Sequence, residues 1–247
     1  MNKEAYLKLV IRRDKLRREA ALINDEYLRV FGERLLELHT LKVECIRKKK
    51  IIRYCQTCWN KGMAILSDEL DTYIANVMTG YEQELKQLRV SVAFAESGTK
   101  IEHYTVARIK KLYYELARKI HPDVLPKEIK DDPVLKDYWM NVYAAYRCND
   151  LEELENLAIV ADERLKELGV DVREYEIEDI DNKAKKIETE IESILETEPY
   201  TYKFLLADSE AVDEMKESLE KEIREYTAYE ITLEEEIQTY PVQGGMN

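Results

Sequence analysis

The chain has 247 residues, enough for one or two domains; 36% of them are charged and 45% are hydrophobic. This balance excludes a disordered tail and a membrane protein, since no apolar run approaches the ~18 residues that cross a bilayer. Seven glycines and five prolines are too few for a sandwich or barrel of many short strands. The composition favours long helices. The residues after Met1 lack the apolar core of a signal peptide, so we expect a cytoplasmic protein.

The net charge of −13 is distributed unevenly. Residues 1–61 carry 16 Lys and Arg against 8 Asp and Glu, whereas residues 149–247 carry 10 against 30. Such segments can attract each other within one chain or between two copies. A basic arm can also bind nucleic acid, but the acidic third would repel phosphate. Pairing within the chain or between copies is therefore the favoured interpretation.

The first predicted element is a helix from Lys3 to about Trp59. Its apolar residues recur every seven positions, in two series displaced by one: Leu9, Leu16, Ile23 and Val30, then Phe31, Leu38, Cys45 and Ile52. A seven-residue repeat forms a seam that packs on a partner helix. A second helix over residues 67–96 has apolar residues at steps of three and four. Together these two helices predict a long helical hairpin over residues 1–98.

Cys55 and Cys58 form a C-x-x-C motif near the end of the first helix. A structural zinc site needs four ligands, and only Cys45 lies nearby. A thioredoxin-type site belongs at a strand-to-helix junction, whereas this pair lies in a helical pattern. We interpret both cysteines as small buried hydrophobic residues and expect no metal ion or cofactor.

The sequence offers no constellation of catalytic residues. It contains three histidines, His39, His103 and His121, and none has a metal-ligand spacing such as H-E-x-x-H. No glycine-rich loop that could cradle a phosphate is found. We therefore assign no catalytic residue and do not expect an enzyme.

The middle of the chain predicts a basic helix that ends at a tight turn. Its apolar residues fall at helical spacing: Ile109, Leu112, Tyr113, Leu116 and Ile120. Its positive charges lie at other angles: Lys110, Lys111, Arg118 and Lys119. Pro122 lacks an N–H and disfavours helical geometry at His121, so the helix must end there. We expect His121 and Asp123 to project from this turn.

Another helix is predicted directly downstream. Asp132 and Pro133 are typical of a cap followed by proline at the first helical position. The helix continues to about Arg147 and carries Trp139, Val142 and Tyr146 on one face. Two antiparallel helices joined by a loop that opens with His121-Pro122-Asp123 would bury their apolar faces against each other. Asp150 can then cap a further helix that ends at Gly169.

The acidic C-terminal part has the most regular pattern. Steps of three and four residues alternate along Ile177, Ile180, Ala184, Ile187, Ile191 and Ile194. After Pro199, Asp208 can cap a final helix. One apolar face of that helix consists of Val212, Met215, Leu219, Ile223, Tyr226, Leu233 and Ile237. We expect a second helical hairpin over residues 170–247.

Two motifs of the middle segment occur together in one known family. The first runs from Ile109-Lys110-Lys111 to His121-Pro122-Asp123, and the second is Trp139-x-x-Val142-x-x-Ala145-Tyr146. This combination resembles the J domain of DnaJ-like co-chaperones over roughly residues 104–148. The flanking hairpins resemble those of bacterial J-domain proteins with coiled-coil flanks. We thus expect an all-α fold, with coiled-coil-like hairpins at 1–98 and 170–247 flanking a J-domain-like module at 99–169.

The resemblance also implies a function. A J domain docks on a DnaK-type heat-shock chaperone and stimulates its ATP hydrolysis. The implied trigger consists of His121, Pro122 and Asp123, and the implied docking face of Lys110, Lys111, Arg118 and Lys119. Trp139, Val142 and Tyr146 would hold the two helices in register and would not touch the partner. The helical arms would bind a client protein or a second copy.

The chain departs from the family pattern at several points. The family's first-helix motif, Y-x-x-L-G, is missing, and either residues 90–94 substitute for that helix or it is absent. Glu115 stands where family members often carry a basic residue. There is no Gly/Phe-rich linker and no repeated C-x-x-C-x-G-x-G zinc motif, so any client would have to bind the helical arms. An alternative function is therefore a structural or adaptor protein with a degenerate, non-stimulating J-like module.

Overall fold

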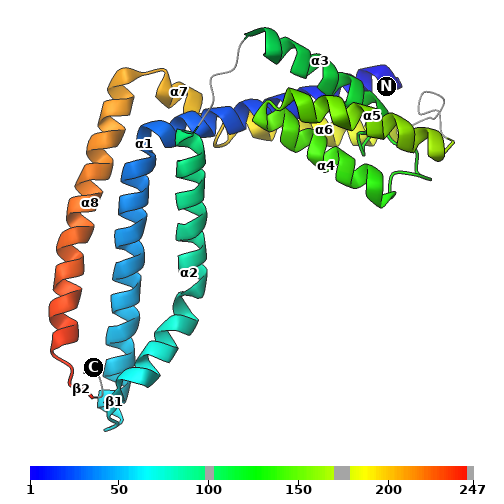
Figure 1. The fold of residues 1–247 in the computed structure, drawn as a ribbon. Helices are drawn as coiled ribbons and strands as arrows, with labels where there is room; N and C mark the ends of the chain where they lie inside the picture. The colour runs from blue at the N-terminus through cyan, green and yellow to red at the C-terminus, as the bar shows by residue number, and fades with distance from the viewer. Residues whose placement is uncertain (98–102, 170–178, 244–247) are drawn as a thin grey trace. The chain divides into compact units, whose positions relative to one another are not determined.

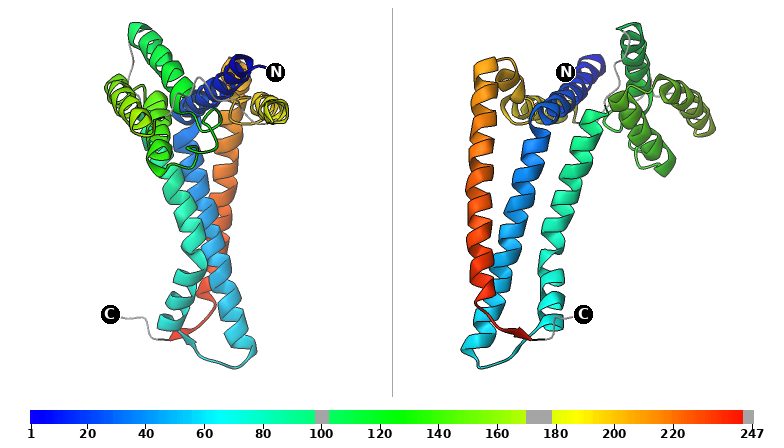
Figure 2. Two further views of the ribbon diagram at one scale, coloured as in Figure 1. Left: turned by 90° about the vertical axis from the view of Figure 1, so that its right-hand side faces the viewer. Right: turned by 60° about the vertical axis from the view of Figure 1, so that its left-hand side comes forward.

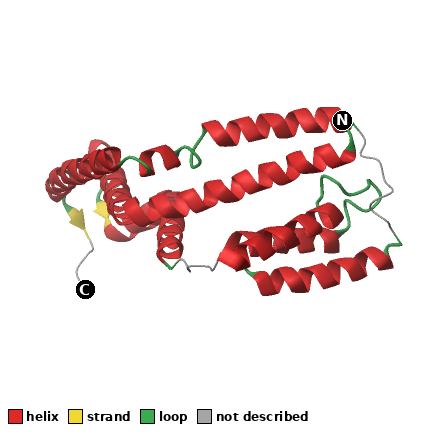
Figure 3. Ribbon diagram, turned by 90° about the horizontal axis from the view of Figure 1, so that it is seen from above, coloured by secondary structure: helices red, strands yellow, loops and turns green. Residues whose placement is uncertain are grey.

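The computed structural model describes residues 1–97, 103–169 and 179–243. Within these ranges the chain is built of helices with two very short strands (Figures 1 and 3). The predicted all-α fold class is confirmed. None of the helices in the described ranges has both the length and the apolar character needed to cross a membrane.

The helix boundaries lie close to the predicted ones. In chain order the elements are α1 (Lys3–Asn60), β1 (Ile65–Leu66), α2 (Ser67–Glu96), α3 (His103–Ile120), α4 (Pro133–Cys148), α5 (Leu151–Glu167), α6 (Ile180–Glu196), α7 (Tyr202–Leu206), α8 (Ser209–Gln238) and β2 (Val242–Gln243). Three predicted caps are confirmed, because each aspartate accepts a backbone N–H of the first turn. Asp132 accepts from Leu135 at 2.9 Å, Asp150 from Glu153 at 3.0 Å and Asp208 from Glu210 at 3.0 Å.

The helices form two compact units, and α1 contributes to both. Unit 1 consists of Met1–Ile23 and Thr99–Thr201, and unit 2 of Asn24–Gly98 and Tyr202–Asn247. Each unit combines segments that are far apart in the sequence, whereas the sequence pattern divided the chain into consecutive stretches at 1–98, 99–169 and 170–247. The long α1 makes this arrangement possible, because its 58 residues supply a packing surface to each unit.

Unit 1 contains two apolar clusters. One lies between α3, α4 and α5, where the predicted faces of α3 and α4 meet. The other joins the start of α1 to α6 through Tyr6, Val10, Leu16, Ala20, Val124, Ala184, Ile187, Ile191 and Tyr200. The predicted apolar stripe of α6 is therefore confirmed for the residues that the structure describes, and Ile177 lies outside them.

In unit 2, α2 and α8 lie on either side of the later part of α1, and the strands lie at one end of these helices (Figures 1 and 2). Phe31, Leu38, Cys45 and Ile52 are buried, as the second seven-residue series predicts. Gly32 permits a close approach of α2, because a Cβ at this position would lie 3.0 Å from both methyl groups of Val92. β1 pairs in parallel with β2, with Ile65 opposite Val242.

The acidic C-terminal helices pack on the basic α1. In unit 1, Arg17 pairs with Glu190 of α6 at 3.0 Å. In unit 2, the α1 side chains Arg34, Lys42 and Lys48 pair with carboxylates of α8: Glu220 at 3.0 Å, Glu222 at 2.9 Å and Glu234 at 2.6 Å. The basic and acidic segments therefore pair within one chain.

The structure differs here from the hairpin expected over residues 170–247. α6 and α8 belong to different units, and each takes a stretch of α1 as its partner. The physical reason lies in α1, which offers each of the two helices an apolar seam and positively charged partners.

Candidate functional site

The helix α3 ends just before Pro122, as expected for a residue that cannot donate a backbone hydrogen bond. The last helical hydrogen bond there runs from the His121 N–H to the Ala117 carbonyl, at 3.2 Å. The N–H groups of Val124 and Leu125 then both donate to the His121 carbonyl, at 2.9 and 3.1 Å. This tight turn, which we call the His-Pro-Asp loop (residues 121–123), begins where the sequence predicts it.

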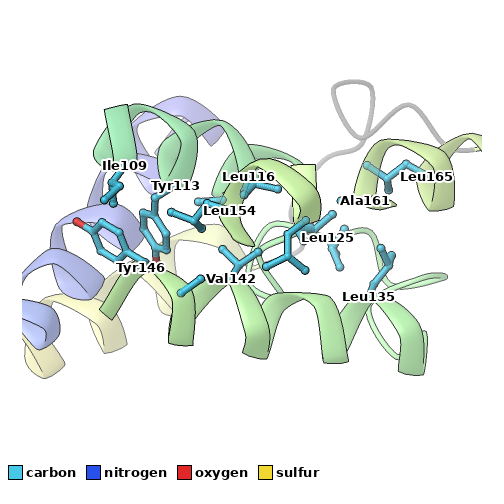
Figure 4. Close-up of a cluster of buried hydrophobic side chains, with 14 of the residues drawn as sticks. Ile109, Tyr113, Leu116, Leu125, Leu135, Val142, Tyr146, Leu154, Ala161 and Leu165 are labelled. Carbon is cyan, nitrogen blue, oxygen red and sulfur yellow. The ribbon is translucent and has the colours of Figure 1, made fainter. Parts of the chain in front are cut away.

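The helices on either side of this loop are held together by aromatic side chains. Tyr113 of α3 stacks on Tyr146 of α4, with ring centroids 3.9 Å apart and ring planes at 14°. Val142 lies in the same cluster, and Leu154 of α5 closes it (Figure 4). Trp139 packs at its edge, with its ring 5.6 Å from that of Tyr113. The packing role expected for Trp139, Val142 and Tyr146 is thus confirmed.

His121 does not project from the loop, and that expectation is wrong. Its side chain is buried, with 3% of the residue exposed, and it lies edge-on to Trp139 with ring centroids 4.4 Å apart. The Nε2 atom lies 3.2 Å from Oδ2 of Asp14, on α1. The physical reason is that α1 covers the loop, which local sequence patterns do not reveal.

Both ring nitrogens of His121 have polar neighbours. The backbone N–H of Asp123 donates to His121 Nδ1 at 2.9 Å. Nε2, beside Asp14, also lies 3.2 Å from Nη2 of Arg13. The imidazole therefore bridges its own loop and α1.

Asp14 is the centre of a buried polar network. It is 2% exposed, and it accepts from the Tyr113 hydroxyl at 2.7 Å and from Arg13 Nε at 3.0 Å. Burial alone would raise the pKa of Asp14, but the hydrogen bond from His121, the charge of Arg13 and the hydrogen bond from Tyr113 bring this pKa below its usual value. Burial and the Asp14 carboxylate raise the pKa of Tyr113.

Arg13 connects α1 to the other end of the loop. Its Nη1 atom donates to Asp123 Oδ2 at 3.0 Å, and Glu190 of α6 lies 3.5 Å away. The neighbouring Tyr6 is also buried, and burial together with the Asp123 charge raises the pKa of Tyr6 to about 12. The carboxylate of Asp123 is therefore paired, although 37% of its side chain is exposed.

A second contact joins α1 to α4. The guanidinium group of Arg18 lies over the ring of Tyr146, 4.2 Å from its centroid. Arg18 also donates to the side chain of Asn149, directly after α4. A guanidinium over an aromatic face is attracted by the ring quadrupole. The start of α1 is thus attached both to the His-Pro-Asp loop and to the end of α4.

Three residues of this site were not expected from the sequence: Arg13, Asp14 and Arg18. A signal for Arg13 exists, because it lies four residues after Leu9 and three before Leu16 and so falls on the apolar seam of α1. A charged residue at such a position must find a buried partner. The apolar pattern of α1 does not identify the carboxylate that pairs with Arg13.

The predicted basic side chains of α3 are in different states. Lys119 pairs with Asp162 of α5, with Nζ at 2.7 and 2.8 Å from its two oxygens. No ion pair joins Lys110, Lys111 or Arg118 to any residue that the structure describes, and Lys111 and Arg118 are exposed. Glu115 is exposed between these last two, one helical turn from each. Within the described part of the chain, three of the four expected docking charges are therefore free for a partner.

Within unit 1, the helix that contacts α3 and α4 is the start of α1. Val90 and Phe94, at the end of α2, are 62% and 51% exposed and belong to unit 2. In unit 1, Arg13 and Asp14 of α1 lie against the His-Pro-Asp loop. No local pattern indicates this contact, since these residues are 98 or more positions before the loop.

The cysteine motif has the features of apolar packing. Cys55 and Cys58 are buried in one cluster with Ile65. Burial raises the pKa of the Cys55 thiol, which favours its neutral and unreactive form. Among the described residues, no group of three or more His, Cys, Asp or Glu side chains is arranged to hold a metal ion.

Comparisons with known proteins identify no relative. No protein-family model matches the chain, and neither a curated protein nor a solved structure matches it. Functional inference therefore depends on the residues and the geometry of the site.

Proposed function

We propose that the chain is a co-chaperone that docks on a DnaK-type heat-shock chaperone and stimulates its ATP hydrolysis. The docking site would comprise α3 and the His-Pro-Asp loop. The observation that carries this proposal is the combination of a tightly packed α3–α4 pair, an intact His-Pro-Asp loop and three basic side chains without an ion-pair partner among the described residues, on the helix that leads into the loop. Unpaired positive charge on a rigid helix suits an acidic partner surface, because charge complementarity orients the encounter.

In this proposal the loop is the trigger, and Lys110, Lys111 and Arg118 supply the electrostatic attraction. Lys119 contributes less than expected, since Asp162 neutralises it. The chain itself would catalyse no covalent step. The remaining helices offer surfaces for a client protein or a second copy. All four cysteines are free thiols, which suits the reducing cytoplasm in which DnaK-type chaperones work.

A single-turnover ATPase assay tests the proposal, with a DnaK-type chaperone from the same organism and the full chain. Wild-type protein should accelerate hydrolysis, and His121→Gln should abolish that acceleration. His39→Gln is the matched control, because His39 is exposed on α1 in unit 2. Asp123→Asn provides a second loop variant at a partly exposed position, in case His121→Gln does not fold.

One observation favours a second candidate function. The burial of His121 against Asp14 is also what a purely structural hydrogen-bonding role requires. In that case the chain would be an adaptor whose J-like module holds α1 in place. Well-folded wild-type protein would then not stimulate hydrolysis, and His121→Gln would lower stability alone.

A further inference from the structure

The His-Pro-Asp loop is covered by the chain's own first helix. Residues 3–23 of α1, which we call the covering segment, place Arg13 and Asp14 against the loop, and these residues are 7% and 2% exposed. His121 and Asp123 each have a polar partner there, at 3.2 and 3.0 Å. A partner that needs these two side chains cannot reach them both in this arrangement.

We propose that the covering segment is an autoinhibitory element, and that partner binding at the His-Pro-Asp loop requires its release. This inference deepens the proposed function and rests on it. The covering segment would keep the loop closed until a partner replaces its contacts. Because the contacts are intramolecular, they compete with any partner at every protein concentration.

The contacts that hold the covering segment can be separated from those that form the loop. The bonds from the N–H of Asp123 to His121 Nδ1 and from the N–H of Val124 to the His121 carbonyl lie within the loop itself. They do not depend on α1. Release of Arg13 and Asp14 would therefore expose His121 and Asp123 while the turn remains formed.

The covering segment is also held from its other side. Arg13 and Arg17 both contact Glu190 of α6, at 3.5 and 3.0 Å. Val124, directly after the loop, belongs to the apolar cluster that joins the covering segment to α6. Opening would expose part of this cluster to water, so the closed state is favoured energetically. An equilibrium between a dominant closed state and a minor open state follows.

A chemical modification experiment tests the covering directly and needs no chaperone. Diethyl pyrocarbonate modifies accessible imidazoles, and mass spectrometry of the full chain can follow His121 and the exposed His39 separately. In wild-type protein, the modification rate of His121 should be lower than that of His39 by a factor of about ten or more, because the open state is a minor one. Arg13→Gln and Asp14→Asn should each accelerate the reaction of His121 about tenfold.

Arg12→Gln is the matched control. Arg12 is the neighbour of Arg13, but it is exposed and has no partner among the described residues. Its substitution by glutamine removes the same charge as Arg13→Gln. It should leave the rate at His121 unchanged. Circular dichroism shows whether each variant keeps its helical structure, and Asp14→Asn preserves side-chain shape if Arg13→Gln unfolds.

The ATPase assay supplies the second readout. If the proposal holds, Arg13→Gln and Asp14→Asn should reach half-maximal stimulation at about tenfold lower concentration than wild type and Arg12→Gln. Rapid modification of His121 in the wild type, or slow modification in both well-folded variants, would overturn the covering. If the modification rates are as expected but no variant stimulates hydrolysis, the proposed function fails while the covering of the loop stands.

Discussion

Asp14 accepts hydrogen bonds from Tyr113 and His121 and neutralises Arg13 in a site that excludes water. Asp14→Asn keeps the shape of the side chain but removes the charge and one acceptor. We expect it to lower the free energy of unfolding at pH 7 by about 1–3 kcal/mol, the range for a buried polar group left without its partner. Denaturation by urea, monitored by circular dichroism, measures this change.

The same residue predicts a dependence on pH. The pKa of Asp14 is lower in the folded chain than its ordinary value of about 3.9. Its contribution to stability is therefore complete above that value and is lost as the pH falls through the folded pKa. The stability difference between wild type and Asp14→Asn should shrink toward the acid end. Parallel stability curves for the two proteins down to low pH would contradict this account.

At the scale of the helices, substitution of two glycines by alanine should have opposite effects on stability. Gly80 lies in α2, and a Cβ added there would have nothing within 4 Å, so Gly80→Ala should stabilise the chain by about 0.5–1 kcal/mol through helix propensity. Gly32→Ala would gain the same propensity but places its Cβ 3.0 Å from the Val92 methyl groups. Overpacking costs about 1–3 kcal/mol, so the net effect should be destabilising or neutral.

The double variant Gly32→Ala with Val92→Ala supplies the control for this contact. Removing the Val92 methyl groups should make the Gly32→Ala change favourable relative to Val92→Ala alone. Thermal unfolding of the four proteins measures the coupling between the two positions. A stabilising effect of Gly32→Ala in the wild-type background would show that α2 does not approach α1 as closely as described.

A substitution at Glu115 tests whether the exposed basic face of α3 binds the partner. Glu115 is exposed between Lys111 and Arg118, and it reduces the positive charge that a partner would meet. Glu115→Lys should lower the concentration for half-maximal ATPase stimulation about twofold to tenfold, and the gain should shrink at high salt. Glu163→Lys on α5 makes the same charge change at another exposed position and should have a smaller effect. Equal effects of the two variants would mean that net charge, and not this face, attracts the partner.

At the scale of the whole molecule, the charge asymmetry of the sequence becomes internal ion pairing along α1. Lys48 contacts both Glu230 and Glu234, at 3.2 and 2.6 Å, with only 16% of its side chain exposed. Lys48→Met keeps the aliphatic stem, and should lower the free energy of unfolding by up to about 1 kcal/mol at low salt. The loss should diminish as salt is added.

Lys50→Met is the comparison for this prediction. Lys50 has no ion-pair partner among the residues described, so its substitution should change stability less than that of Lys48. Urea denaturation at two salt concentrations distinguishes them. Similar, salt-independent changes in both variants would argue that the α1–α8 ion pairs contribute nothing to stability.

Much of the fold could be predicted because its signals are local. Apolar periodicity marked the helices, and Asp132, Asp150 and Asp208 marked three of their starts. The partners of the helices could not be predicted in this way. A seam such as that of α6 specifies that a helix packs, but not on which helix, and α1 offers apolar surface in both units.

In the site, too, local features could be predicted and contacts between distant residues could not. The position of the His-Pro-Asp loop follows from Pro122, because proline ends α3 whatever that helix packs against. The burial of His121 depends on Asp14, which is 107 positions earlier in the sequence and is recognisable only once α1 lies against the loop. Polar contacts of this kind have no periodicity, so they cannot be predicted from a sequence pattern.

Hydrogen–deuterium exchange of the full chain, with and without the ATP-bound DnaK-type chaperone, tests the central claim most directly. We predict that amides of α3 and the His-Pro-Asp loop gain protection on binding, and that amides near Arg13 and Asp14 lose it as the covering segment is released. Binding that protects only other helices, with α3 and the loop unchanged, would contradict the account.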